Sequence, residues 1–292
     1  MGDRNFRHML EKQWSRGNFV CVGLDSELSK IPYSAVCYYS SRMGISITNT
    51  IATFNRAIVE ETKDLVCAYK PNIAFYEACG AEGLNALRET IADIHKIAPD
   101  VPVILDAKRA DIGNTNAGYV DMAFDFLQAD AITVHPYLGA EALQPFLDCG
   151  DKGIIVLCRT SNKGAGEFQD KYISVATGYN MPLYQYVAHR VATDWNKNGN
   201  CALVVGATYP DELRKVRGLV GDMPILIPGI GAQGGDVEKT VSAGKDSRGQ
   251  GMIINSSRGI IFASSGADFA EAARRETKKL HDLIHYYLTG GK

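Results

Sequence analysis

The residues best suited to chemistry lie in one short stretch, Asp106-Ala107-Lys108-Arg109-Ala110-Asp111. Asp106 and Lys108 stand two residues apart at the end of an apolar run, so on a strand their side chains face the same side. Asp111 comes three residues later, in the loop that we expect after this strand. Two carboxylates around one ammonium keep the lysine charged and orient a donor beside a substrate. The stretch therefore predicts a catalytic charge cluster.

Charged or polar residues also follow other apolar runs of the chain. They are Asp25 after the first run, Lys70 after the second, His135 after the fourth, Arg159, Thr160 and Ser161 after the fifth, and Asn255 to Arg258 after the eighth. Each alone has an ordinary structural explanation, such as a helix cap or a lysine that extends to solvent. Together, at equivalent ends of several strands, they predict one shared site. Lys70 extends the cluster to an alternating Lys–Asp–Lys–Asp array.

The glycine-rich segment after the seventh run indicates a phosphate site. Glycines allow a close approach of the backbone N–H groups to an anion; those that we expect to do so are Gly229, Gly231, Gly234 and Gly235. Gln233 offers an amide donor in the same segment, and Arg258 at the next strand end offers a bidentate guanidinium. The structural alternative for these glycines is turn geometry alone.

Eight short apolar runs alternate with helical patterns and supply the elements that must position these residues. The runs are Phe19–Leu24, Leu65–Tyr69, Val101–Leu105, Ala131–Val134, Gly153–Leu157, Cys201–Val205, Pro224–Ile227 and Gly251–Ile254. Helical spacing covers Ser46–Lys63, Gly83–Ala98, Thr115–Leu127, Leu183–Asn196 and Asp268–Tyr287. Such alternation is typical of a (β/α)₈ barrel, with its active site at the carboxyl ends of the strands. A doubly wound open sheet is the alternative, although the Gly-rich turn usual after its first strand is missing here.

Two long connections interrupt this pattern without indicating a domain boundary. Ser26–Asp64 holds three tyrosines before its helix, and Thr160–Tyr179 is polar and Gly-rich, which predicts a mobile loop at the active site. We expect residues 1–292 to form a single domain.

Composition excludes several classes of protein. With 31 Lys and Arg against 33 Asp and Glu, the net charge of −2 predicts no general attraction to nucleic acid or to an anionic membrane. The seven cysteines are scattered, which indicates reduced core thiols rather than disulfides. We see no signal peptide and no membrane span, so we expect a cytoplasmic protein. Neither metal-ligand spacing nor a P-loop or dinucleotide motif is found.

The motifs resemble those of the orotidine 5'-monophosphate decarboxylase family over nearly the whole chain. The D-x-K-x-x-D-I stretch ending at Ile112, followed by Thr115, is similar to the family signature. Leu24-Asp25, Tyr69-Lys70-Pro71-Asn72, the segment Pro228–Gly235 and Ser256-Ser257-Arg258 also match. The long Ser26–Asp64 segment resembles the longer, bacterial-type branch.

The resemblance implies a role for each matching residue. In the family pattern Lys108 donates a proton to C6 of the pyrimidine, Asp106 faces the substrate carboxylate and Lys70 completes the charge array. Asp25 binds a ribose hydroxyl, Ser161 the pyrimidine ring, and Gln233 and Arg258 the phosphate. Asp111 and Thr115 reach the ligand of a neighbouring subunit, which implies a homodimer with shared sites. No metal or organic cofactor is implied.

Two alternatives stay open from the sequence. A sugar-phosphate decarboxylase of the same superfamily that uses magnesium shares the D-x-K-x-x-D pattern, and sensitivity to EDTA would indicate it. A non-catalytic barrel that binds nucleotide phosphates is the second alternative. The complete set of Lys70, Asp106, Lys108 and Asp111 argues against it, because a sensor does not need clustered charge that lowers its stability.

Overall fold

The computed structural model describes residues 4–40, 44–175, 178, 180–231 and 234–291, and its centre is a parallel sheet of eight strands. The strands are β1 (Val20–Leu24), β4 (Val66–Pro71), β5 (Ile104–Arg109), β6 (Ala131–Val134), β7 (Gly153–Arg159), β10 (Cys201–Val205), β11 (Ile225–Pro228) and β12 (Met252–Ser256). Their order is β4-β1-β12-β11-β10-β7-β6-β5, and parallel bridges between Tyr69 and Val103 and between Asn72 and Asp106 join the two edges. The sheet is therefore a closed (β/α)₈ barrel, as predicted, and the open sheet is excluded.

Each predicted apolar run overlaps one barrel strand, because strands buried on both faces are largely apolar. Four strands extend beyond their runs into polar residues: β4, β5, β7 and β12. The extension is possible because these ends still pair with neighbours, as Lys70 does with Gly23 and Asn255 with Cys21. The predicted start of the third strand at Val101 was wrong, since β5 begins at Ile104.

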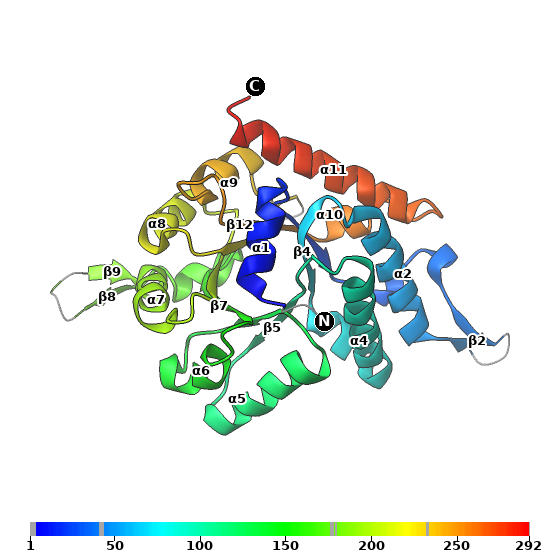
Figure 1. Cartoon of the computed structure of the whole chain (residues 1–292), viewed down its shortest axis with the longest axis horizontal. Coiled ribbons are helices and arrows are strands. Elements are labelled where there is room, and N and C mark those ends of the chain that lie inside the picture. The colour runs from blue at the N-terminus through cyan, green and yellow to red at the C-terminus, as the bar shows by residue number, and fades with distance from the viewer. Residues whose placement is uncertain (1–3, 41–43, 176–177, 179, 232–233, 292) are drawn as a thin grey trace.

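Helices cover the outside of the barrel (Figure 1). They are α2 (Ile47–Thr62), α3 (Ile73–Glu77), α4 (Gly80–Ile97), α5 (Gly113–Val120), α6 (Gly139–Leu147), α7 (Leu183–Arg190), α8 (Pro210–Val220), α9 (Val237–Gly244), α10 (Arg258–Ile261) and α11 (Phe269–Leu288). The five predicted helices coincide with α2, α4, α5, α7 and α11. Both α5 and α7 continue as π-helical turns, over Asp121–Phe126 and Val191–Trp195. Ser46 caps α2 by accepting a hydrogen bond from the N–H of Asn49, which explains the start of this helix.

Helix α1 (Phe6–Ser15), which the sequence pattern had not indicated, lies across the amino-terminal end of the barrel (Figure 1). Its buried Trp14 donates its indole N–H to the carbonyl of Met252 at 2.8 Å. A Cβ at Gly153 would come within 2.2 Å of the Phe6 ring, so this glycine makes room for the helix. Since α1 covers this end, the barrel is accessible from the carboxyl ends of its strands.

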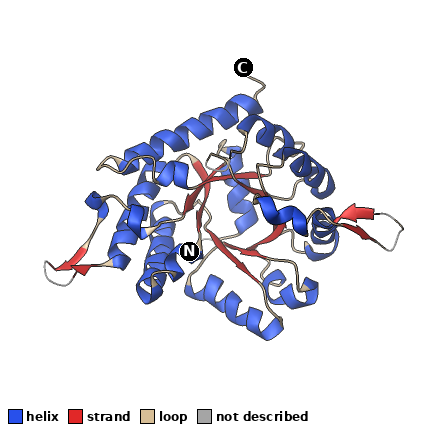
Figure 2. Cartoon of the chain, turned by 180° about the vertical axis from the view of Figure 1, so that it is seen from behind, coloured by secondary structure: helices blue, strands red, loops and turns tan. Residues whose placement is uncertain are grey.

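The two long connections form hairpins that project from opposite sides of the barrel (Figures 1 and 2). The first pairs β2 (Tyr38–Ser40) with β3 (Gly44–Ile45), and the second pairs β8 (Tyr172–Ser174) with β9 (Asn180–Pro182). The predicted loop Thr160–Tyr179 thus contains a 3₁₀ turn over Lys163–Glu167 and strand β8. Its residues Ala176, Thr177 and Tyr179 lie outside the described residues.

All seven cysteines are free, and four of them, Cys21, Cys67, Cys158 and Cys201, are buried. Four of the thiols thus lie in the core, as predicted, whereas Cys37, Cys79 and Cys149 are half-buried. Over the residues that the structure describes, no helix has the length and apolar character to cross a membrane.

Candidate active site

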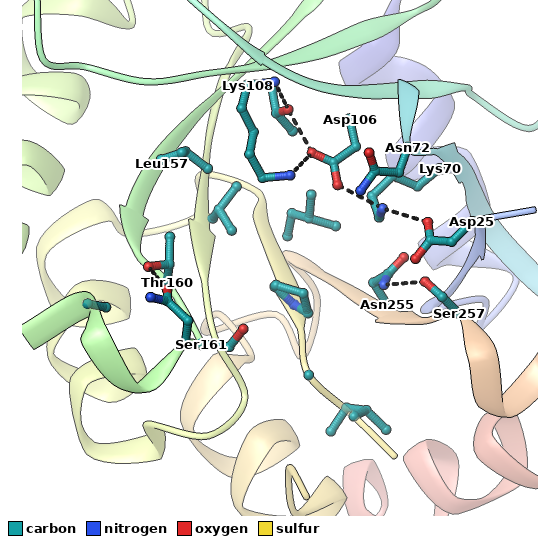
Figure 3. Close-up of a pocket in the computed structure, with 18 of the residues that line it drawn as sticks. Asp25, Lys70, Asn72, Asp106, Lys108, Leu157, Thr160, Ser161, Asn255 and Ser257 are labelled. Atoms are coloured by element: carbon teal, nitrogen blue, oxygen red, sulfur yellow. Dashed lines mark hydrogen bonds and ion pairs between the residues drawn. The ribbon is translucent and has the colours of Figure 1, made fainter. Parts of the chain in front are cut away.

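A cavity of about 750 Å³ opens at the carboxyl ends of the strands, where the sequence predicted the site. One of its walls carries four alternating charges from three neighbouring strands (Figure 3). Lys70 Nζ lies 2.9 Å from Asp106 Oδ2 and 3.7 Å from Asp25 Oδ1, and Lys108 Nζ lies 2.6 Å from Asp106 Oδ1. The order Asp25–Lys70–Asp106–Lys108 presents two carboxylates and two ammonium groups to the same cavity.

Because these side chains are buried, the ionisation of each one depends on the charges of its neighbours. Lys70 is 3% exposed and Asp106 is 9% exposed. Burial opposes ionisation of Asp106, but Lys70 and Lys108 outweigh that effect and lower the pKa of this carboxyl well below its usual range. Burial likewise favours the neutral amine of Lys70, yet Asp106 and Asp25 raise the pKa of this lysine above its ordinary value. Asp106 and Lys70 are therefore both charged at neutral pH.

The backbone at Lys108 differs from the regular strand that the sequence argument assumed. Lys108 has a positive φ of 49°, and the register of β5 against β6 shifts between Leu105 and Arg109. Simple alternation along a strand was thus the wrong reason for pairing Asp106 with Lys108. The two side chains meet because a bulge turns Lys108 back toward the cavity.

Asp111 and Thr115 do not line the cavity of their own chain. Among the described residues Asp111 forms no ion pair with Lys108; its backbone N–H donates to Asn116 Oδ1 at 2.8 Å. The predicted array Lys70–Asp106–Lys108–Asp111 is therefore wrong within one chain, where Asp25 supplies the fourth charge. His135 also lies outside the cavity, with Nδ1 accepting from the N–H of Tyr137.

The glycine-rich segment reaches the cavity through Pro228, Gly229 and Ile230, whereas the predicted Gly231, Gly234 and Gly235 are not among the lining residues. Gly231 and Gly234 have φ values of 81° and 80°, which side chains disfavour. At Gly235 a Cβ would lie 2.7 Å from the carbonyl oxygen of Gly229. Turn geometry and close packing thus require glycine at these three positions. Gln233 lies outside the described residues.

Arg258 lines the same end of the cavity, at the start of α10. Its side chain is exposed and forms no ion pair within the described part of the chain, so the guanidinium is available to an anion. The predicted phosphate-binding arginine therefore lines the same cavity as the Asp–Lys array.

The wall opposite the array comes from the segment after β7 (Figure 3). Ser161 lies there as predicted, close against β10, where a Cβ at Gly206 would be 2.7 Å from Ser161 Cα. Thr160 donates its N–H to Gln169 Oε1 at 2.9 Å. Arg159 stacks over the Tyr209 ring at 3.8 Å and pairs with Asp170, so this residue anchors the segment and does not face the substrate space.

Sequence reasoning gave no role to several polar residues of the cavity, among them Asn72, Thr133 and Asn255. Asn72 and Asn255 stand at strand ends, and the sequence analysis named both among the residues there without giving them a role. Asn255 Oδ1 is buried and has no hydrogen-bond partner among the described residues. Thr133 donates its hydroxyl to Asp106 Oδ1 at 2.9 Å, and no sequence signal marks a threonine inside a strand.

Among the residues that the structure describes, no group of three or more His, Cys, Asp or Glu side chains could hold a metal ion.

In (β/α)₈ barrel enzymes the active site lies at the carboxyl ends of the strands. The charged cavity at this end of the barrel therefore places the protein in the class of barrel enzymes. The chain belongs to the orotidine 5'-phosphate decarboxylase / HUMPS family, whose model matches residues 19–275.

Similar proteins cover almost the whole chain. The orotidine 5'-phosphate decarboxylase of Ralstonia nicotianae is 48% identical over 283 residues, which are 97% of this chain and 98% of that protein. Among solved structures, the OMP decarboxylase of Leishmania donovani has a TM-score of 0.77 at 37% identity, covering 96% of this chain and 99% of its own. The UMP synthase of the same organism has a TM-score of 0.80 at 38% identity; the match covers 96% of this chain but only 56% of that longer chain.

Proposed function

We propose that the protein converts orotidine 5'-monophosphate to uridine 5'-monophosphate and CO₂, a step of pyrimidine biosynthesis. The observation that carries the proposal is the Asp25–Lys70–Asp106–Lys108 array, with its fixed charges at the mouth of the barrel. The high identity to proteins named orotidine 5'-phosphate decarboxylase over nearly full length supports the same substrate.

The reaction breaks the bond between C6 of the pyrimidine and its carboxylate. The substrate carboxylate binds against Asp106, whose lowered pKa keeps it ionised. Two like charges at about 4 Å repel each other by about 4 kcal/mol at an effective dielectric near 20. Loss of CO₂ relieves this repulsion and leaves the electron pair on C6.

Lys108 completes the chemistry. Its ammonium, held 2.6 Å from Asp106 Oδ1, stabilises the developing carbanion and then donates a proton to C6. The resulting amine is protonated again from solvent. Lys70 keeps Asp106 charged and contacts the ribose together with Asp25.

The remaining substrate groups bind around this centre. Ser161 contacts the pyrimidine, and Arg258 with Gln233 and the backbone near Gly231, Gly234 and Gly235 binds the phosphate. The apolar residues Leu157, Val204 and Leu226 line the same cavity and favour release of the uncharged CO₂. Binding energy from the remote phosphate then assembles the site around the reacting carboxylate.

Asp111 and Thr115 act on the site of a second subunit in a homodimer. This proposal rests on their position outside their own cavity. The loops after β5 and β6 also expose the apolar residues Ile112, Tyr137 and Leu138, which a partner subunit covers.

The 292 residues act as one catalytic domain in the cytoplasm. The reaction uses neither a metal nor an organic cofactor, and the protein binds neither nucleic acid nor a membrane.

The magnesium-dependent alternative and the non-catalytic one predict different results in one assay. Purified protein is incubated with orotidine 5'-monophosphate, with and without EDTA, while substrate absorbance is followed. We expect turnover that EDTA does not change and that uridine 5'-monophosphate inhibits. Loss of activity in EDTA favours the metal-dependent sugar-phosphate enzyme, whereas nucleotide binding without CO₂ release favours the sensor.

A further inference from the structure

Thr133 on β6 connects the backbone of the catalytic stretch to its carboxylate. This side chain is 1% exposed. Its hydroxyl oxygen accepts the backbone N–H groups of Ala107 at 3.0 Å and of Lys108 at 2.9 Å. The same hydroxyl donates to Asp106 Oδ1 at 2.9 Å. One side chain thus contacts all three residues from Asp106 to Lys108.

These three bonds use the full capacity of the hydroxyl, which has one proton and two lone pairs. Asp106 Oδ1 receives both this proton and the ammonium of Lys108, while Oδ2 receives Lys70. Each carboxylate oxygen therefore has a defined donor on the protein side, and the plane of the carboxylate is fixed before substrate binds.

The backbone bonds of Thr133 lie where the strand is irregular. Lys108 has a φ of 49°, in a region where the Cβ of an L-residue crowds the next carbonyl oxygen. Regular strand pairing of β5 with β6 is interrupted from Leu105 to Arg109, so the N–H groups of Ala107 and Lys108 have no ladder carbonyl there. The hydroxyl of Thr133 replaces those carbonyls and holds the bulge.

We propose that Thr133 is a positioning residue, which fixes the Asp106–Lys108 bulge so that both charges face the reacting C6 carboxylate. It acts through Asp106 and Lys108 and does not itself transfer a proton. The inference rests on the proposed roles of those two residues. A threonine is suited to this position because its methyl group packs in the barrel and fixes the rotamer, whereas its hydroxyl bonds to the neighbouring strand.

The test compares Thr133→Val, which keeps the shape and removes the hydroxyl, with Thr133→Ser, which keeps the hydroxyl. We expect T133V to lower kcat by about 30-fold, the range for lost hydrogen bonds to charged groups. Its affinity for uridine 5'-monophosphate, which lacks the carboxylate, stays within about threefold. T133S keeps at least a third of the wild-type kcat.

A matched control separates positioning from loss of stability. Thr277 on α11 is also buried and donates its hydroxyl to the carbonyl of Ala273 at 2.7 Å. Neither residue lines the cavity. Thr277→Val should lower the melting temperature without changing kcat. If T133V does not fold, Thr133→Cys replaces it, since a thiol is a poor acceptor at nearly the same volume; kcat should then fall at least fivefold.

Three outcomes would overturn the proposal: a kcat of T133V within twofold of wild type, a T133S as impaired as T133V, or an equal loss in T277V. Lys108→Ala is measured in parallel. If that variant keeps its turnover, the proposed role of Lys108 fails. If it is inactive while T133V turns over normally, only the role of Thr133 fails.

Discussion

Lys70 and Asp106 form a buried ion pair between the neighbouring strands β4 and β5, with 2.9 Å between Nζ and Oδ2. A second carboxylate, that of Asp25, lies 3.7 Å from the same ammonium. Lys70 therefore separates two carboxylates that would otherwise repel each other inside the barrel. The same arrangement links the stability of this rim to the ionisation of its groups.

The stability contributed by Asp106 should depend on pH. Its folded pKa lies below the ordinary 3.8, so the contribution is complete above that value and is lost as pH falls through the lower folded pKa. The raised pKa of Lys70 keeps this lysine charged throughout the acid range. We expect Asp106→Asn to lower the free energy of unfolding by about 3 kcal/mol at pH 6, because it leaves a buried charge less well paired.

Urea denaturation between pH 2.5 and 7 at one protein concentration measures this difference. The gap between wild type and Asp106→Asn should be constant from pH 5 to 7 and shrink below pH 3.8. A gap that stays constant down to pH 2.5, or that widens, contradicts the ion-pair account.

Gly206 should be required for the position of Ser161. In Gly206→Ala the new Cβ would meet Ser161 Cα at 2.7 Å and its N at 2.9 Å, and both are backbone atoms that cannot move separately. We expect the variant to lose about 2 kcal/mol of stability and at least tenfold in kcat/KM. Gly218→Ala is the matched control, since Gly218 lies within α8 and its Cβ would meet nothing within 4 Å.

The control should be slightly more stable than wild type, because alanine favours a helix by about 1 kcal/mol over glycine. Thermal melts and steady-state kinetics of both variants test the comparison. Equal behaviour of the two alanine variants would contradict the close packing between Gly206 and Ser161.

Arg258 should act on the phosphate and not on the reacting carboxylate. Its exposed side chain lines the cavity and forms no ion pair with the array among the described residues. Arg258→Ala should lower kcat/KM for orotidine 5'-monophosphate by about 100-fold, the usual range for a lost charged contact. With orotidine, which has no phosphate, the same substitution should change kcat/KM less than threefold. An equal loss with both substrates contradicts the assignment.

Shared sites predict recovery of activity between two inactive variants. Lys108→Ala damages a subunit's own site, whereas Asp111→Ala damages the site of its neighbour. In a heterodimer of the two, one site carries both changes and the other carries neither. After subunit exchange, half of the dimers are mixed, so activity should reach about a quarter of wild type. No recovery in a mixture whose exchange is verified would contradict the shared dimer site.

The barrel could be predicted from sequence because its strands are buried on both faces. Val156 and Leu203, for example, are both fully buried and belong to uninterrupted apolar runs. The hairpin around Tyr38 could not be predicted, since its residues are exposed and form no periodic apolar pattern. Helix α1 was missed although its buried Phe6, Met9, Leu10 and Trp14 recur at helical spacing; it precedes the first strand and so lies outside the strand–helix alternation from which the barrel was predicted.

The site was predicted in part. Strand-end position was enough to bring Asp25, Lys70, Asp106 and Lys108 to one wall, because the carboxyl ends of parallel strands converge. It was not enough to place Asp111, whose direction depends on the bulge at Lys108. Nor could spacing reveal Thr133, since its role depends on the register between two strands that are distant in sequence.

The most direct test of the central claim is the rate of CO₂ release by Lys108→Ala, measured in a single turnover with saturating enzyme. The claim is that Lys108, held against Asp106 at 2.6 Å, stabilises and protonates the carbanion at C6. We predict a rate at least 10⁴-fold below wild type, at the upper end of contributions from a positioned acid. Affinity for uridine 5'-monophosphate should stay within tenfold, and Lys278→Ala, an exposed lysine on α11, should behave as wild type. A Lys108→Ala protein that releases CO₂ within tenfold of the wild-type rate would contradict the account.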